Sequence, residues 1–299
     1  SIVLASPITD NADILKVRAF NNVVFTDVLA KGNNLSDVTS VSTARTNLGL
    51  GDVLTDITSI ETQQAQGQNY GTNLFINGDF SIWQRGTSQT SSDFGSDDRW
   101  RNLNTGTTKV ASQQTFTLGQ TDVPGNPTYY ARTVVTSVAG ASNFCTKSQG
   151  VEDVTKTSGR QVTLSFYAKA DAAKSIVTEF VQICGTGGSP SSAVLGISPT
   201  THALTTSWQR FTMTTTLPSV TGKTLGTNNN SSLGLNFWFD AGSSLDARTD
   251  SLGQQSGTFD IANVQLEFGD TATEFEYVPP ADQLARCQRY FFKTWELGT

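Results

Sequence analysis

VTLSFYAK, residues 162–169, decides the fold, because apolar and polar side chains alternate along it without a break. In an extended chain Val162, Leu164 and Phe166 share one face, and the residues between them share the other. LGLNFWFD, residues 233–240, has the same period of two. The two stretches therefore predict half-buried β-strands, each with one face in a hydrophobic core.

Further short strands are predicted on both sides, separated by Gly, Asn, Asp and Pro. In the last of them the apolar phase changes at Ala262 and Asn263, which predicts a β-bulge. The number and spacing of the strands favour an antiparallel sandwich, a jelly roll, over βαβ units. We expect a mainly β domain over residues 71–279. Its other candidate strands are 109–118, 129–138, 176–184, 208–217 and 258–268.

The two ends of the chain differ from this domain. Residues 1–70 lack the periodicity of a core, but Val53, Ile57 and Ile60 have the a/d spacing of a short coiled coil. Two heptads are too short to form a stable isolated helix, so we expect this segment to fold by oligomerising. The alternative is one amphipathic turn lying on the next domain. Residues 280–299 predict a short helix followed by an aromatic strand.

Composition excludes several classes of partner. The chain has 299 residues, 36% hydrophobic and 15% charged, with a net charge of -6 and no cluster of Lys or Arg. We therefore expect no nucleic-acid partner. No run approaches the roughly 18 apolar residues of a membrane span, so no membrane insertion is expected. Cys145, Cys184 and Cys287 lack CxxC spacing and predict buried free thiols, as suits folding in bacterial cytosol.

LAKGNNLSDVTSVSTARTNLGL, residues 29–50, closely resembles an element found in many bacteriophage tail fibres. The resemblance implies chains arranged around a threefold axis, a homotrimer. It also implies a place in the virion, on tail fibre or related appendage, with other tail, baseplate or virion proteins as partners. Together with the coiled-coil positions, the residues expected to trimerise the chain are Leu35, Val38, Ala44, Leu48, Val53, Ile57 and Ile60.

A second resemblance covers most of residues 73–292. NLFINGDFSIWQRG, residues 73–86, looks like the entry strand of a β-sandwich module of phage fibres, and residues 272–291 look like its exit. TSWQRFT at 206–212 and FDIANVQLEFG at 259–269 are similar to parts of carbohydrate-binding jelly rolls. These resemblances imply a sandwich that binds host-surface polysaccharide, although a shared fold alone does not establish a function.

Related sugar-binding modules often hold a structural calcium ion with acidic groups of the first and last strands. Here Ala262 and Asn263 stand where paired acids would be expected. Asp79 and Asp260 remain as weak calcium candidates, because sites with few carboxylates bind calcium weakly. We expect no cofactor.

Glycan binding requires aromatic faces flanked by amides and acids that hydrogen-bond hydroxyl groups. Trp238, Asn236 and Asp240 share one face of their predicted strand and form a candidate patch if that face is open. The alternative is that both faces are covered. Tyr129 and Tyr130 follow a turn and are further candidates near one end of the sandwich.

Catalysis would need two carboxylates facing each other across a cleft. Asp97 and Asp98 are adjacent, which is typical of a solvated turn, and His202, the single histidine, is interpreted as a surface-loop residue. Gly185–Gly188 lacks the lysine of a phosphate loop and predicts a turn. We expect no enzyme. Five acidic residues are candidates for such a carboxylate pair: Asp97, Asp98, Glu152, Asp153 and Glu179.

The leading hypothesis is a trimeric fibre or adhesin subunit, made in the host cytoplasm, that attaches to the phage by its N-terminus and binds host glycan through a jelly roll. One alternative is a purely structural tail or baseplate connector, or a capsid decoration fibre, with no host ligand. A polysaccharide depolymerase is a third, weaker hypothesis.

Overall fold

A computed structural model describes residues 40, 42–44 and 72–294 of the chain. By internal contacts the chain divides into two compact units, Ser1–Gly67 and Gln68–Thr299. Within the described residues, no helix is both long and apolar enough to cross a membrane. The residues predicted to trimerise the chain lie outside the described residues, except Ala44. They are Leu35, Val38, Leu48, Val53, Ile57 and Ile60.

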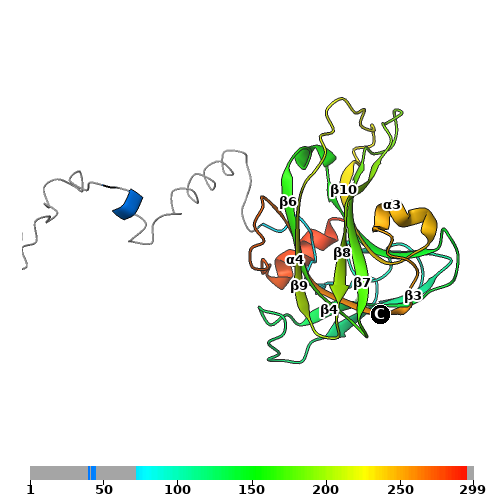
Figure 1. Cartoon of the computed structure of the whole chain (residues 1–299), viewed down its shortest axis with the longest axis vertical. Coiled ribbons are helices and arrows are strands. Elements are labelled where there is room, and N and C mark those ends of the chain that lie inside the picture. Colours follow the sequence, from blue (N-terminus) through cyan, green and yellow to red (C-terminus); the bar gives the residue numbers. More distant parts are fainter. Residues whose placement is uncertain (1–39, 41, 45–71, 295–299) are drawn as a thin grey trace, which may run out of the picture. The chain divides into compact units, whose positions relative to one another are not determined.

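The second unit is built on two antiparallel sheets, which confirms the predicted β-sandwich (Figure 1). Successive strands cross repeatedly between the sheets, as in jelly rolls. In spatial order the six-stranded sheet contains β1 (Ser88–Gln89), β3 (Thr108–Thr115), β4 (Tyr129–Thr136), β11 (Gly257–Phe268), β6 (Gln161–Ala170) and β9 (Gln209–Thr216). The five-stranded sheet contains β2 (Arg101–Thr105), β5 (Phe144–Glu152), β10 (Ser232–Ala241), β7 (Lys174–Ile183) and β8 (Val194–Leu204).

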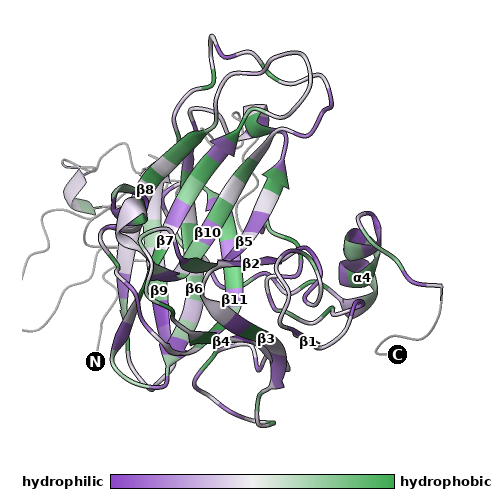
Figure 2. Ribbon diagram, turned by 90° about the vertical axis from the view of Figure 1, so that its right-hand side faces the viewer, coloured by the Kyte–Doolittle hydropathy of each residue, from purple (hydrophilic) through white to green (hydrophobic). Residues whose placement is uncertain are grey.

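The main core lies between the sheets and follows from the alternation seen in the sequence (Figure 2). Phe166 of β6 and Phe237 of β10 are fully buried and meet edge to face, with ring centroids 5.0 Å apart. Trp100 packs on Phe237 at 6.2 Å and closes the same core. Burial of such aromatic side chains supplies much of the stabilisation of a sandwich.

The strands that sequence analysis missed have identifiable physical reasons. β5 carries buried polar residues such as Lys147 and Gln149, so its apolar period is weak. β8 contains Gly196 and Pro199 and has two register irregularities against β7, so it does not resemble a regular strand. β2 has five residues and shows little periodicity.

The predicted bulge in β11 is confirmed. The pairing of β11 with β6 shifts register between Ala262 and Gln265, and Asn263 has a φ of 48°. The extra residue lets Phe259 and Ile261 before the bulge, and Val264 and Leu266 after it, all face the core.

The expected entry strand is wrong, because residues 73–86 form bends, turns and coil with no strand. Asn77 and Phe80 have φ values of 60° and 55°. The buried Asn77 side chain stabilises this path by donating to the carbonyls of Ile82 and Asp98, each at 2.9 Å. Phe75 and Phe80 thereby reach the core without belonging to either sheet.

The solvated turn expected at Asp97–Asp98 is also wrong, because both side chains are buried. Lys147 of β5 donates to Asp97 and, at 2.7 Å, to Asn102 Oδ1. Asp98 pairs with Arg85 at 3.3 Å, and burial raises the pKa of its carboxyl group. A buried ion pair that is fully hydrogen-bonded fixes the path of the segment more than it adds stability.

At the C-terminal end, the predicted short helix is confirmed as α4 (Pro280–Gln288), but residues 289–294 form a turn and coil in place of a strand. Two of their aromatic side chains pack against arginine guanidinium groups. The Arg99 guanidinium lies 3.5 Å from the centroid of the Tyr290 ring, and Arg85 lies 3.7 Å from that of Phe291. The predicted free, buried state of all three cysteines is confirmed.

His202 is a buried residue of β8, so its interpretation as a surface-loop histidine is wrong. Its Nε2 shares a hydrogen bond of 2.8 Å with Thr178 Oγ1, and its ring contacts Phe166 and Phe211 edge to face. Burial lowers the pKa of His202 from 6.5 to about 4.

This burial predicts a pH dependence of stability. Between the folded pKa of about 4 and the unfolded value of 6.5, the unfolded chain binds the extra proton, so stability falls as pH is lowered through this window. The loss attributable to His202 approaches about 3 kcal/mol. Denaturant titrations of the wild type and of His202→Gln at several pH values measure it. The variant should lack this part of the slope, and identical slopes would contradict the assignment.

Candidate functional site

The patch around Trp238, which depended on an open face, is covered, so the alternative stated for this strand, with both faces covered, is the one found. Trp238 is 3% exposed, and its Nε1 donates to Glu179 Oε2 at 2.9 Å. Arg248, carried by the short helix α3 (Asp246–Thr249), pairs with Glu179 and lies 4.9 Å from the centroid of the Trp238 ring. A second apolar cluster, which includes Val177 and Trp238, forms under this cover.

The two polar members of the predicted patch are also occupied. Asp240 is fully buried and accepts from Thr107 Oγ1 at 2.5 Å, from Ser137 Oγ at 2.8 Å and from the backbone N–H of Gln255 at 2.7 Å. Asn236 is half-buried and donates to Glu179 Oε2 at 3.1 Å. Asp240 is therefore engaged by three protein donors and Asn236 by the Glu179 carboxylate.

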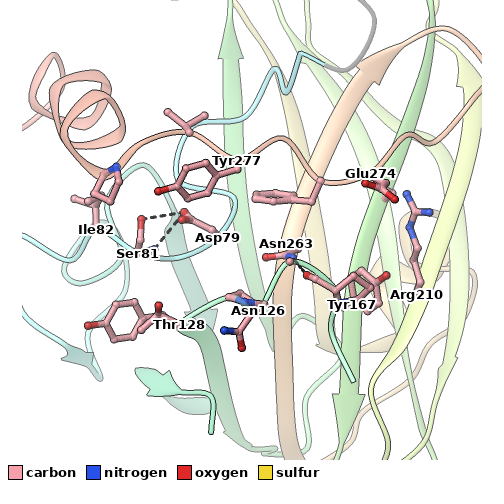
Figure 3. Close-up of a pocket in the computed structure, with 18 residues that line it drawn as sticks. Asp79, Ser81, Ile82, Asn126, Thr128, Tyr167, Arg210, Asn263, Glu274 and Tyr277 are labelled. Atoms are coloured by element: carbon pink, nitrogen blue, oxygen red, sulfur yellow. Dashed lines mark hydrogen bonds between the residues drawn. The ribbon is translucent and has the colours of Figure 1, made fainter. Parts of the chain in front are cut away.

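A groove of about 660 Å³ lies on the other sheet (Figure 3). Its floor is formed by the outward-facing residues of β6, β9 and β11 around the bulge, and its walls come from three coil segments far apart in sequence. The volume is within the range of small-ligand sites. The walls are contributed by residues 79, 81–82, 124–129, 274–275, 277–278 and 280, and the floor by Ser165, Tyr167, Arg210 and Asn263.

Asn263 is the key polar residue of the floor. The bulge turns its side chain outward, where its Nδ2 donates to the carbonyl of Pro124 at 3.4 Å. Its Oδ1 has no hydrogen-bond partner although the residue is only 4% exposed. An unsatisfied buried acceptor costs about 1–3 kcal/mol, so a ligand hydroxyl that donated to Oδ1 would recover that cost.

Two carboxylates and one guanidinium add charge to the lining. Asp79 Oδ1 accepts from Ser81 Oγ at 3.0 Å and from Gln283 Nε2 at 3.3 Å. Arg210 donates through Nη2 to the carbonyls of residues 272 and 273, which anchors the wall to β9. Glu274 lies beside Arg210 at the same end of the groove (Figure 3).

Three tyrosines contribute rings to the groove lining, beside aliphatic residues and Phe275. Tyr167 belongs to the floor, and Tyr129 and Tyr277 belong to the walls, with Tyr277 76% exposed. The structure thus places the predicted candidate Tyr129 in the groove. No pattern in the sequence marks Tyr277 as a groove residue. Tyr167 could have been identified, because it lies on the polar face of the alternating stretch 162–169.

Tyr130, the other predicted tyrosine, does not line the groove. It packs against Phe116 at 4.7 Å and edge to face against Trp208 at 5.2 Å. Burial, followed by the charge of Asp260, raises the pKa of Tyr130. The aromatic cluster lies at the base of the β3–β4 loop, whose residues 124–128 belong to one groove wall.

The two weak calcium candidates, Asp260 and Asp79, lie in different surroundings. Asp260 is paired with Arg132 through both carboxylate oxygens, at 2.7 and 2.8 Å, and lies 3.9 Å from Lys169. Calcium would have to displace these cations. Asp79 belongs to the groove. Among the described residues, no group of three or more His, Cys, Asp or Glu is positioned to hold a metal ion.

The acids considered for hydrolysis have local partners and lie apart from the groove lining. Glu152 pairs with Arg289 at 2.7 Å, and Asp153 accepts from the backbone N–H of Thr155 at 3.1 Å. Asp97, Asp98 and Glu179 are the buried acids described above.

No protein-family model and no curated protein matches the chain. Among solved structures, a CBM4 module is 16% identical, over 64% of this chain and 98% of that chain, with a TM-score of 0.36. A family 11 carbohydrate-binding module from Clostridium thermocellum, in complex with a mixed-linked tetrasaccharide, is 11% identical, over 63% and 99%, with the same TM-score. The enzymatically active domain of tailspike protein 4 of bacteriophage CBA120 is 12% identical, over 66% of this chain and 21% of that chain, also with a TM-score of 0.36. These values are too low to establish a function for the chain.

Proposed function

We propose that the described sandwich binds a glycan in the groove around Asn263. The observation that carries the proposal is the unpartnered Oδ1 of Asn263, almost completely buried in a floor that also contains Tyr167. Six buried side-chain polar atoms of the described residues lack a hydrogen-bond partner, and Asn263 Oδ1 is the one among them that belongs to the groove lining, where a ligand can supply the missing donor. A sugar hydroxyl supplies such a donor.

The rest of the lining suits the mixed surface of a sugar. Tyrosine rings pack against the C–H faces of pyranoses, while amides and carboxylates bind the hydroxyl groups at their edges. Tyr167 and Tyr277 offer rings, and Asp79 and Asn126 offer polar groups. The groove is bordered by loops on a rigid sheet, a common arrangement for binding sites.

We further propose that the chain is a non-catalytic subunit of a phage fibre in the virion, that it forms a homotrimer, and that it binds host-surface polysaccharide without a metal cofactor. The tail-fibre resemblance of residues 29–50 and the a/d spacing of Val53, Ile57 and Ile60 support the trimer. Three linked grooves would strengthen weak individual binding through effective concentration. The purely structural connector remains the competing function, and the experiments below distinguish the two.

The binding proposal predicts that Tyr277→Ala raises the Kd for a bound glycan roughly tenfold or more, equivalent to about 1.4 kcal/mol. The reason is loss of an exposed ring from the groove wall. A glycan array identifies a ligand, and calorimetric titration of that ligand measures the Kd.

Phe292→Ala is the matched control, because Phe292 is 65% exposed and does not line the groove. It should bind as the wild type does, and EDTA should leave the Kd unchanged. Failure of the wild type to bind any glycan, or equal affinities of both variants, would count against the groove and favour a structural connector.

The trimer proposal predicts a mass in solution of three times the 32.0 kDa chain, measured by light scattering. Ile57→Asp should reduce it toward that of the monomer, since a charge in an a/d seam is desolvated without a partner. Thr58→Asp introduces the same charge outside the seam and should remain trimeric. A monomeric wild type would refute the trimer.

A further inference from the structure

The groove lining contains three acceptor groups to which a ligand can donate. Asn263 Oδ1 is orphaned, and the lining also contains the carboxylates of Asp79 and Glu274. Two donors of the lining residues are engaged within the protein, because Asn263 Nδ2 donates to Pro124 and Ser81 Oγ donates to Asp79. A ligand that brings hydroxyl or amide donors can satisfy these acceptor groups.

The formal charges of the lining residues also bear on which ligands the groove can bind. Among the described residues that line it, Arg210 carries the one positive charge, against the two carboxylates. Arg210 Nη2 is engaged by two backbone carbonyls, and Glu274 lies beside the guanidinium (Figure 3). An acidic group that approached Arg210 would meet Glu274 as well, and elsewhere in the groove it would meet Asp79.

We infer that the groove selects glycan segments without acidic substituents and rejects uronic acids, sialic acids and sulfated sugars. Hydroxyl and amide N–H groups can donate to Asn263 Oδ1 and to the carboxylates, whereas an ionised acid group can only accept. Like charges at short range across a partly desolvated groove repel one another. The inference rests on the proposed function and specifies the substrate class of the same site.

The test is an array that carries neutral oligosaccharides together with uronate, sialylated and sulfated members, probed with the wild type and with Tyr277→Ala. We expect the members that depend on Tyr277 to be neutral. The double variant Asp79→Asn/Glu274→Gln should bind matched acidic members at least roughly tenfold more tightly than the wild type does. Glu152→Gln removes an exposed carboxylate outside the groove and should leave the selectivity unchanged.

Three outcomes separate the claims. Tyr277-dependent binding of neutral members alone, with acidic members gained by the double variant, supports both the groove and its selectivity. Tyr277-dependent binding of acidic members overturns the selectivity while the groove stands. Absence of any Tyr277-dependent member overturns the proposed function, and the selectivity with it. Added salt provides a further check, because screening should improve acidic binding to the wild type and leave neutral binding unaltered.

Discussion

One extra residue in β11 is the constraint on which the rest of the site depends. Phe259 and Ile261 face the core before the bulge, and Val264 and Leu266 face it after the bulge, so the register has to shift between them. The shift places Asn263 in a left-handed conformation on the outer surface of the sheet. Core packing thus fixes the position of the groove's buried amide, the residue to which we assign the proposed glycan contact.

The two outer faces of the sandwich differ, because one is covered by protein and the other carries the groove. On the five-stranded sheet, the fully buried carboxylate of Glu179 binds Arg248, Trp238 and Asn236, and α3 covers that face. On the six-stranded sheet, three coil segments surround the floor without filling it. The Glu179–Arg248 ion pair lies on one face, and the unpartnered Asn263 Oδ1 lies in the groove on the other.

Sequence reasoning predicted the features that depend on local periodicity. The strands containing residues 162–169 and 233–240, the bulge at Asn263 and the helix after Pro279 were all confirmed. The cover over Trp238 depends on a distant arginine, Arg248, whose pairing no local pattern reveals. The groove was missed for the same reason, because its walls are remote in sequence and meet only after the sandwich has formed.

The most direct test of the glycan site is a crystal structure of the protein with a bound oligosaccharide identified on the array. The account predicts a sugar in the groove, with one hydroxyl within hydrogen-bonding distance of Asn263 Oδ1 and a ring packed on Tyr167 or Tyr277. A sugar bound at any other surface, with Asn263 Oδ1 still unpartnered, would contradict the central claim.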